Sequence, residues 1–267
     1  PLWGGAMAYR TLLYNVADGV ASVTLNRPAK LNAFNDQMIG EALDAFKSAG
    51  RDDAVRCVVI SGTGRAFSSG QDLGDFQGRG EDVSIAEHLR HGYHRLIKQM
   101  VTLEKPILGA INGVAAGAGC GVALAADIRV ASDAASFMLA FSRIGLIPDS
   151  GVNWFLPRLI GYARAYEMAI TAERVPAARA LEWGMVNRVV SGEQLPEIVA
   201  AYARQLAEGP TLAFGLTKRA MNRSWGMDLD EALAYEAHLQ EVAGRSQDNR
   251  EGIAAFLEKR AAAFAGR

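Results

Sequence analysis

The sequence predicts an α/β core over residues 7–193, followed by an all-α region over residues 194–267. Three observations support this fold class. In the first part of the chain, apolar runs typical of strands are followed by turns and by segments with helical periodicity. Beyond residue 193 the chain is rich in Ala, Leu, Glu, Gln, Lys and Arg, with few strand signals. The 267 residues are 50% hydrophobic and 21% charged, which suffices for a sizeable buried core.

Apolar and β-branched runs predict the strands, which we place at residues 11–16, 20–25, 56–61, 107–112, 127–131, 136–139 and 186–190. The first two flank Asp18 and Gly19, a dipeptide that favours a hairpin turn. The third contains the run CVVI, which is typical of a strand buried on both faces. Because the remaining strands alternate with helical segments, we expect parallel pairing with right-handed crossovers.

Helical spacing of apolar residues predicts helices over residues 35–49, 84–103 and 152–159, a helix of small residues that ends near 126, and several helices in the tail. Asn35 carries a side chain suited to cap the first of them. Residues 62–82 are expected to form a long loop. In the tail, turn-forming residues predict helix breaks near 209–210, 225–228 and 244–248.

The charge balance excludes large anionic partners. The chain has 28 basic and 29 acidic residues and a net charge of −1, so no global field attracts nucleic acid or an anionic membrane. Residues 107–126 carry no charge, but they are mainly Gly and Ala and are too weakly apolar to insert as a transmembrane helix. We therefore expect neither nucleic acid nor a membrane as a partner.

Two cysteines, Cys57 and Cys120, cannot build a disulfide framework or a cysteine-rich metal site. A reduced, cytoplasmic location is the simplest interpretation. Residues 1–6 precede Met7 and lack the basic start and apolar centre of a signal peptide. We interpret them as foreign to the native protein, which would begin at Met7.

No metal ion is expected. His88, His91 and His94 are spaced by three on a predicted helix, and three such positions drift around the cylinder. A solvated helix face therefore explains them better than a metal site. The G-x-G-x-x-G motif of dinucleotide-binding sites is also incomplete, because Val122 stands where its third glycine belongs.

Two glycine-rich segments each follow a predicted buried strand. Residues 62–73 contain three glycines, which allow a ligand to approach the backbone closely, although a plain surface loop is an equal alternative. Residues 112–121 open a helix, whose first N–H groups have no intrahelical acceptor. Ligands bind at the carboxyl ends of strands in α/β folds, so the two segments could aim two N–H groups at one oxygen, as in an oxyanion hole. Tight helix packing explains the second segment as well.

Asp149 stands in the sequence GLIPDSG at residues 145–151. It has the position and side chain of an N-cap for the helix expected over residues 152–159. Alternatively, it is a catalytic carboxylate beside the two glycine-rich segments. Local sequence leaves both interpretations open.

Five segments, in this combination and order, resemble those of the crotonase superfamily of enoyl-CoA hydratases and isomerases: LNRP at 25–28, RAFSSGQDL at 65–73, INGVAAGAG at 111–119, GLIP at 145–148 and GMVN at 184–187. The resemblance implies a crotonase-like spiral of strand–strand–helix units with a C-terminal all-α region for trimerisation. It also implies that the protein binds acyl-CoA thioesters. The backbone N–H groups of Gln71 and Ala118 would hold the thioester oxygen while an enolate forms.

The departures from this family pattern bear on the reaction. Hydratases of the family use two glutamates, at the positions that Gly121 and Phe141 occupy here. Neither residue can move a proton, whereas hydration needs both a base and an acid. Asp149 remains, at the position where isomerase branches carry their carboxylate. One carboxylate suffices to shift a proton between two carbons, and Gly121 and Phe141 would leave an apolar pocket for a bulky acyl group.

The chain is most similar to the branch that isomerises ring-epoxyphenylacetyl-CoA in phenylacetate degradation, through segments such as AFSRIGLIPD at 140–149. The resemblance therefore implies an acyl-CoA isomerase with Asp149, Gln71 and Ala118 as catalytic residues. The alternatives are an enoyl-CoA hydratase that uses other acids, such as Asp75 or Glu87, and a non-catalytic member that binds CoA.

The resemblance also assigns substrate or CoA contacts to Arg27, Lys30, Ala66, Ser69, Asp72, Leu73, Gly117, Gly121, Phe141 and Lys259. The three basic residues are candidates for the CoA phosphates, and each could equally be a solvated surface charge. Relatives form homotrimers or dimers of trimers, in which a tail lysine can reach a neighbour's CoA. CoA is part of the substrate, and no separate cofactor is expected.

Overall fold

The computed structural model describes residues 9–77 and 84–267. The predictions for residues 1–6 and for a native start at Met7 lie outside the described residues, as does part of the expected loop over 62–82. Among the described residues, no helix has the length and apolar character needed to cross a membrane.

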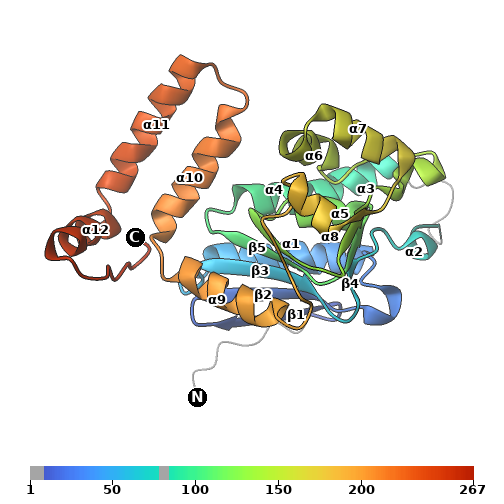
Figure 1. The fold of residues 1–267 in the computed structure, drawn as a ribbon, viewed down its shortest axis with the longest axis horizontal. Coiled ribbons are helices and arrows are strands. Elements are labelled where there is room, and N and C mark those ends of the chain that lie inside the picture. Colours follow the sequence, from blue (N-terminus) through green and yellow to red (C-terminus); the bar gives the residue numbers. More distant parts are fainter. Residues whose placement is uncertain (1–8, 78–83) are drawn as a thin grey trace.

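The described residues form two sheets. The larger one has six strands, in the order β1 (Leu12–Ala17), β2 (Val20–Leu25), β3 (Cys57–Gly62), β5 (Ile107–Ile111), β7 (Ile128–Ser132) and β10 (Arg188–Val190) (Figure 1). β1 and β2 form the predicted antiparallel hairpin, with Asp18 and Gly19 both at positive φ in its turn. The other neighbouring strands in this sheet pair in parallel, as the alternation of strands and helices predicts.

The smaller sheet has the order β4 (Ala66–Ser68), β6 (Val114–Ala116), β8 (Ser136–Met138) and β9 (Val175–Pro176). β3, β5 and β7 are each followed along the chain by a short strand of this second sheet. The chain therefore alternates between the sheets, which confirms the expected spiral. The sequence predicts a loop and a turn where β4 and β6 lie. These predictions are wrong, because each strand is held by a parallel partner that is distant in the sequence.

The helices are α1 (Asp36–Arg51), α2 (Leu73–Gln77), α3 (Ile85–His91), α4 (Tyr93–Thr102), α5 (Ala118–Leu124), α6 (Val152–Ile160), α7 (Tyr162–Thr171), α8 (Ala177–Glu182), α9 (Leu195–Ala207), α10 (Thr211–Ser224), α11 (Leu229–Gly244) and α12 (Gln247–Glu258), with 3₁₀ turns η1 (Pro28–Lys30) and η2 (Ala140–Ile144). Asn35 caps α1 as predicted, since its side chain accepts from Met38 N–H at 3.0 Å. The single helix predicted over residues 84–103 is wrong. It breaks at Gly92, where φ is −103° and ψ is −97°.

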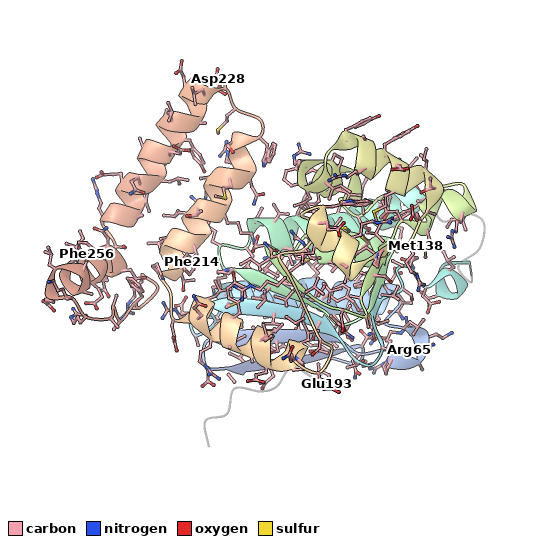
Figure 2. The ribbon with its side chains drawn as sticks, in the orientation of Figure 1. Arg65, Met138, Glu193, Phe214, Asp228 and Phe256 are labelled. Carbon is pink, nitrogen blue, oxygen red and sulfur yellow. The ribbon has the colours of Figure 1, made fainter. Side chains whose placement is uncertain are left out.

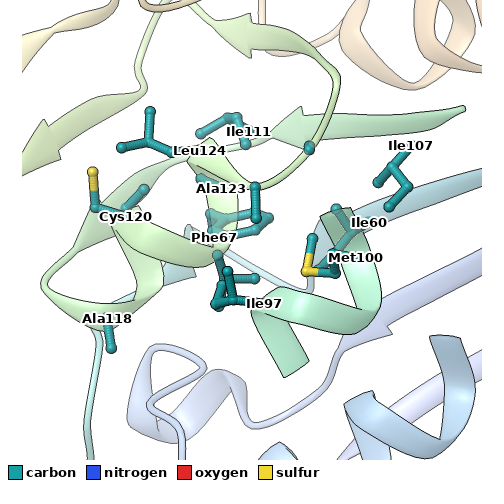
Figure 3. Packing of buried hydrophobic residues seen from close by; sticks show 14 of the residues in the cluster. Ile60, Phe67, Ile97, Met100, Ile107, Ile111, Ala118, Cys120, Ala123 and Leu124 are labelled. Atoms are coloured by element: carbon teal, nitrogen blue, oxygen red, sulfur yellow. The ribbon is translucent and has the colours of Figure 1, made fainter. Parts of the chain in front are cut away.

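Strand β3 of the larger sheet is buried on both faces, as the run CVVI predicts. Successive side chains of β3 point to opposite faces, so Val58 and Ile60 enter the main core while Cys57 and Val59 pack against α9. Figure 3 shows the main core where α5 and α4 meet the strands, with Ala118 at one end of α5.

The predicted all-α region is confirmed beyond α9. In Figure 1, α10, α11 and α12 extend away from the two sheets. Phe214 on α10, Asp228 before α11 and Phe256 on α12 mark this arm in Figure 2. Helix α9 instead packs against the larger sheet. The boundary between residues 193 and 194 stays a prediction.

Candidate active site

Three loops converge because β4, β6 and β8 are parallel neighbours and end at the same edge of the smaller sheet. A cavity of about 310 Å³ opens beside this edge. Its lining is mostly apolar and consists of Ser69, Gln71, Leu73, Ile85, His88, Leu89, Tyr93, Gly117, Ala118, Ala140, Phe141, Arg143, Ile144, Leu146 and Asp149. All three predicted catalytic residues are among them, together with Ser69, Leu73, Gly117 and Phe141 from the predicted binding set.

The loop after β4 is shaped by Gly70 and by Phe34. Gly70 has a φ of +94°, and a Cβ there would lie 2.8 Å from the carbonyl oxygen of Ala116. Phe34 N–H donates to the oxygen of Gly70 at 2.7 Å, and Asp72 N–H donates to the oxygen of Phe34 at 2.8 Å. The two hydrogen bonds of this parallel bridge use the carbonyl of Gly70 and the N–H of Asp72, the residues on either side of Gln71. The N–H of Gln71 therefore points away from Phe34. Within the described residues it has no acceptor.

The second N–H belongs to Ala118, the first residue of α5. Gly117 precedes it with a φ of +52°, which turns the chain sharply from β6 into the helix. A first-turn N–H has no intrahelical acceptor, and the described part of the chain offers Ala118 no other. The two loops are in close contact, since a Cβ on Gly70 would lie 3.4 Å from Ala118 N.

Gly121 does not line the cavity, which corrects its predicted role in widening the acyl pocket. A Cβ at Gly121 would lie 2.4 Å from the oxygen of Ser150. The turn at residues 149–151 therefore fills the space that a side chain at position 121 would need. Ser150 and Gly151 both have positive φ, and this sharp turn places Asp149 at the cavity.

The N-cap interpretation of Asp149 is wrong. Helix α6 has Gly151 as its N-cap and no side-chain cap hydrogen bond. The Asp149 carboxylate instead lines the cavity and accepts from the Ser150 hydroxyl at 2.7 Å. Burial raises the pKa of Asp149 above its ordinary value, although the Ser150 hydrogen bond and the nearby His88 and His94 act to lower it.

His88 was missed by sequence reasoning. His91 and His94 are exposed, as a solvated helix face predicts, but the His88 side chain is only 8% exposed and lines the cavity. Its Nε2 lies 3.1 Å from Gln71 Oε1, which also accepts from the Tyr93 hydroxyl at 2.8 Å. The sequence signal that could have revealed this role of His88 was Gly92, which breaks the helix between the apolar patterns of α3 and α4. No cluster of metal-ligating side chains occurs within residues 9–77 and 84–267.

The other predicted substrate or CoA contacts, Arg27, Lys30, Ala66, Asp72 and Lys259, are not part of the described cavity lining. Arg27 forms an ion pair of 2.9 Å with Asp72. Burial acts to raise the pKa of Asp72, but Arg27 and the N–H of Asp75 outweigh it and hold that pKa below its usual value. Lys30 is exposed on η1, and Ala66 is buried in β4. Lys259 follows α12, which Figure 1 places far from β4 and α3.

The model of the enoyl-CoA hydratase/isomerase family matches residues 15–267. The chain belongs to this family. It is 43% identical over 258 residues to a protein of Escherichia coli (strain K12) named 1,2-epoxyphenylacetyl-CoA isomerase, which covers 96% of this chain and 98% of that protein. It is 44% identical over 261 residues to a protein of Rhodobacter capsulatus named "probable enoyl-CoA hydratase", with 98% and 100% covered. A crystal structure of an enoyl-CoA hydratase from Bacillus anthracis is 31% identical with a TM-score of 0.90, covering 97% of this chain and 100% of that one.

As a member of the enoyl-CoA hydratase/isomerase family, the protein is an enzyme of a family that acts on acyl-CoA thioesters. The predicted family and fold are confirmed. Relatives of similar identity carry isomerase and hydratase names. The choice between the two reactions therefore rests on the residues at the cavity.

Proposed function

We propose that the protein is an acyl-CoA isomerase that shifts a double bond or rearranges a ring epoxide. The observation that carries the proposal is the cavity's composition. Asp149 is the only carboxylate in its described lining, and it faces walls formed mainly by apolar residues. Hydration needs a base for the water and an acid for the α-carbon, whereas a proton shift needs one group that takes and returns a proton.

In the proposed reaction, the thioester oxygen accepts hydrogen bonds from the N–H groups of Gln71 and Ala118. Asp149 removes a proton from a carbon of the acyl chain, and the C–H electron pair delocalises into the thioester as a dienolate. Asp149 then returns the proton two carbons away, so the mass is unchanged and no cofactor is needed beyond the CoA of the substrate. The raised pKa of Asp149 supports this role, because it makes the carboxylate a stronger base than an exposed aspartate.

Ring-derived acyl groups are the proposed substrate class. Phe141, Leu73 and Leu89 give the cavity apolar walls that can hold a ring. The relative named 1,2-epoxyphenylacetyl-CoA isomerase supports the same class, and with it a role in phenylacetate degradation. The buried free thiols of Cys57 and Cys120 are consistent with the proposed cytoplasmic location.

Hydration is the second candidate, because His88 gives the cavity another titratable side chain and a close relative carries a hydratase name. Asp75 and Glu87, the acids suggested by sequence for this reaction, are not part of the described cavity lining. Hydration would therefore have to use His88 in place of a second carboxylate.

A product assay distinguishes these candidates. We expect 3-hexenoyl-CoA to become 2-hexenoyl-CoA, and ring-1,2-epoxyphenylacetyl-CoA to give an isomer of identical mass. Products are identified by mass spectrometry and NMR. A hydroxyacyl product heavier by one water would replace isomerisation with hydration. No conversion of any of these thioesters would leave the non-catalytic alternative.

We also propose a homotrimer, or a dimer of two trimers. Phe256, Leu257 and Leu229 on α11 and α12 are 83%, 74% and 74% exposed, which is more apolar surface than an isolated helical arm normally presents to water. Covering this arm with neighbouring subunits would also let Lys259 reach another subunit's CoA. We expect sedimentation equilibrium to give three or six times the mass of one chain. A monomer at micromolar concentration would refute this prediction.

A further inference from the structure

The side chain of Gln71 is held by two donors. The Tyr93 hydroxyl donates to Gln71 Oε1 at 2.8 Å, and His88 Nε2 lies 3.1 Å from the same oxygen. An amide oxygen only accepts, so Nε2 of His88 must carry a proton to complete this contact. The Gln71 residue is thus restrained at both ends, because its backbone is bridged to Phe34.

The imidazole of His88 is itself oriented from the other side. Its Nδ1 lies 3.3 Å from Oδ1 of Asp36, in the first turn of α1. A second proton on Nδ1 makes this contact an ion pair, so both ring nitrogens can donate at once. His88 therefore links helix α1 to the loop that carries Gln71.

The break between α3 and α4 brings the two donors together. Gly92 separates His88 from Tyr93, and a Cβ on Gly92 would lie 2.9 Å from the oxygen of His88. The rings of His88 and Tyr93 meet edge to face at 5.7 Å, and Tyr93 also packs edge to face on Phe34 at 5.8 Å. Tyr93 is almost fully buried, so its hydroxyl has little freedom to leave Gln71.

We propose that His88 and Tyr93 are positioning residues that act through the Gln71 side chain to hold the Gln71 backbone N–H at the thioester oxygen. The inference rests on the proposed function, in which this N–H is an oxyanion donor. Hydrogen bonds in an oxyanion hole are sensitive to sub-ångström placement, and a misplacement of about 1 Å can reduce turnover about 10²-fold. Neither side chain needs to touch the reacting carbons.

The test is a pair of double-mutant cycles. They use the single variants Tyr93→Phe, His88→Ala and Gln71→Ala, and the two double variants that pair Gln71→Ala with each of the others. We expect each single variant to lower kcat for 3-hexenoyl-CoA by about 10-fold to 10²-fold, with little change in KM. Each double variant should be no slower than Gln71→Ala alone, because the interaction has already been removed. His88→Gln, whose amide can still donate to Gln71, should recover part of the rate. His91→Ala, on the exposed part of the same helix, is the matched control and should retain wild-type turnover.

A second measurement reads the thioester directly. Hexanoyl-CoA labelled with carbon-13 at the carbonyl has no double bond to isomerise, and its C=O stretching frequency reports hydrogen bonding to the oxygen. Binding to the wild-type enzyme should lower this frequency, and the Tyr93→Phe and His88→Ala variants should lose part of that shift. Melting temperatures of all variants are measured alongside.

Additive losses in the double variants would overturn the inference, because His88 or Tyr93 would then act on the substrate directly. The inference would also be overturned if Tyr93→Phe and His88→Ala both had wild-type turnover and the same C=O frequency shift as the wild-type enzyme. The enzyme could fail to isomerise 3-hexenoyl-CoA and still lower the C=O frequency of bound hexanoyl-CoA in a way that depends on His88 and Tyr93. That result would support the positioning role and refute the proposed function. A wild-type enzyme without any shift would refute both.

Discussion

Asp149→Asn is expected to lower the rate of isomerisation by about 10²–10⁴-fold, the usual contribution of general acid–base catalysis. Asn cannot accept the substrate proton, but it has nearly the same shape and can still accept from the Ser150 hydroxyl that now bonds Asp149. Binding of hexanoyl-CoA should change little, because the N–H groups of Gln71 and Ala118 are untouched. In deuterium oxide the wild-type enzyme should exchange substrate protons, and the variant should not.

The control for this variant is Asp53→Asn, which removes an exposed carboxylate that is not part of the described cavity lining. It should have wild-type turnover. If Asp149→Asn also turned over like the wild type, Asp149 would have no part in the mechanism, and the proposed reaction would lack its base.

The raised pKa of Asp149 predicts two pH effects with opposite signs. Activity requires the ionised carboxylate, so kcat should fall as the pH is lowered through this raised pKa. Stability behaves differently, because a carboxyl group whose pKa is higher in the folded than in the unfolded state binds its proton more tightly when folded. Its stabilising contribution is present below the unfolded pKa and is lost as the pH rises through the folded pKa. At neutral pH, Asp149→Asn should therefore melt at the same temperature as the wild type or higher.

Ala118→Pro is expected to lower turnover by at least about 10²–10³-fold, the typical cost of removing one oxyanion-hole donor. Ala118 is the first residue of α5, where proline is well tolerated and where the N–H makes no intrahelical hydrogen bond. The substitution should therefore remove the donor without breaking the helix. Turnover of 3-hexenoyl-CoA and the C=O frequency of bound hexanoyl-CoA should both show the loss.

Two controls separate the missing N–H from crowding by the proline ring. Ala118→Gly keeps the N–H and should retain most of the activity. Replacing the amide of Ala118 by an ester, with lactic acid incorporated at position 118, removes the N–H without adding a ring, although it also weakens the Gly117 carbonyl as an acceptor for the N–H groups of Cys120 and Gly121. This enzyme should be nearly as slow as the proline variant. If the ester enzyme has full activity, Ala118 is not an oxyanion donor.

Much of the fold and part of the site follow from local sequence. The CVVI run predicts a strand buried on both faces, because only such a strand needs consecutive apolar residues. The helix breaks in the tail follow from Gly209 and Pro210 and from the capping residues Asp228 and Ser246. At the cavity, the family motifs correctly place Gln71, Ala118 and Asp149 together, since each follows a strand of the smaller sheet.

Only the tertiary structure decides the remaining features. β4 and β6 are three residues each and become strands by pairing with each other, although they are far apart in the chain. His88 has the helical spacing of an exposed residue and is buried because Gln71 and Asp36 lie on either side of it. The backbone of Ser150 fills the space beside Gly121, and Asp149 faces the cavity because the two residues after it adopt positive φ. By itself the sequence determined most of the elements and the family motifs, because these depend on neighbours within a few positions. Contacts between distant segments decided which side chains surround that carboxylate, because such contacts form only when the chain has folded.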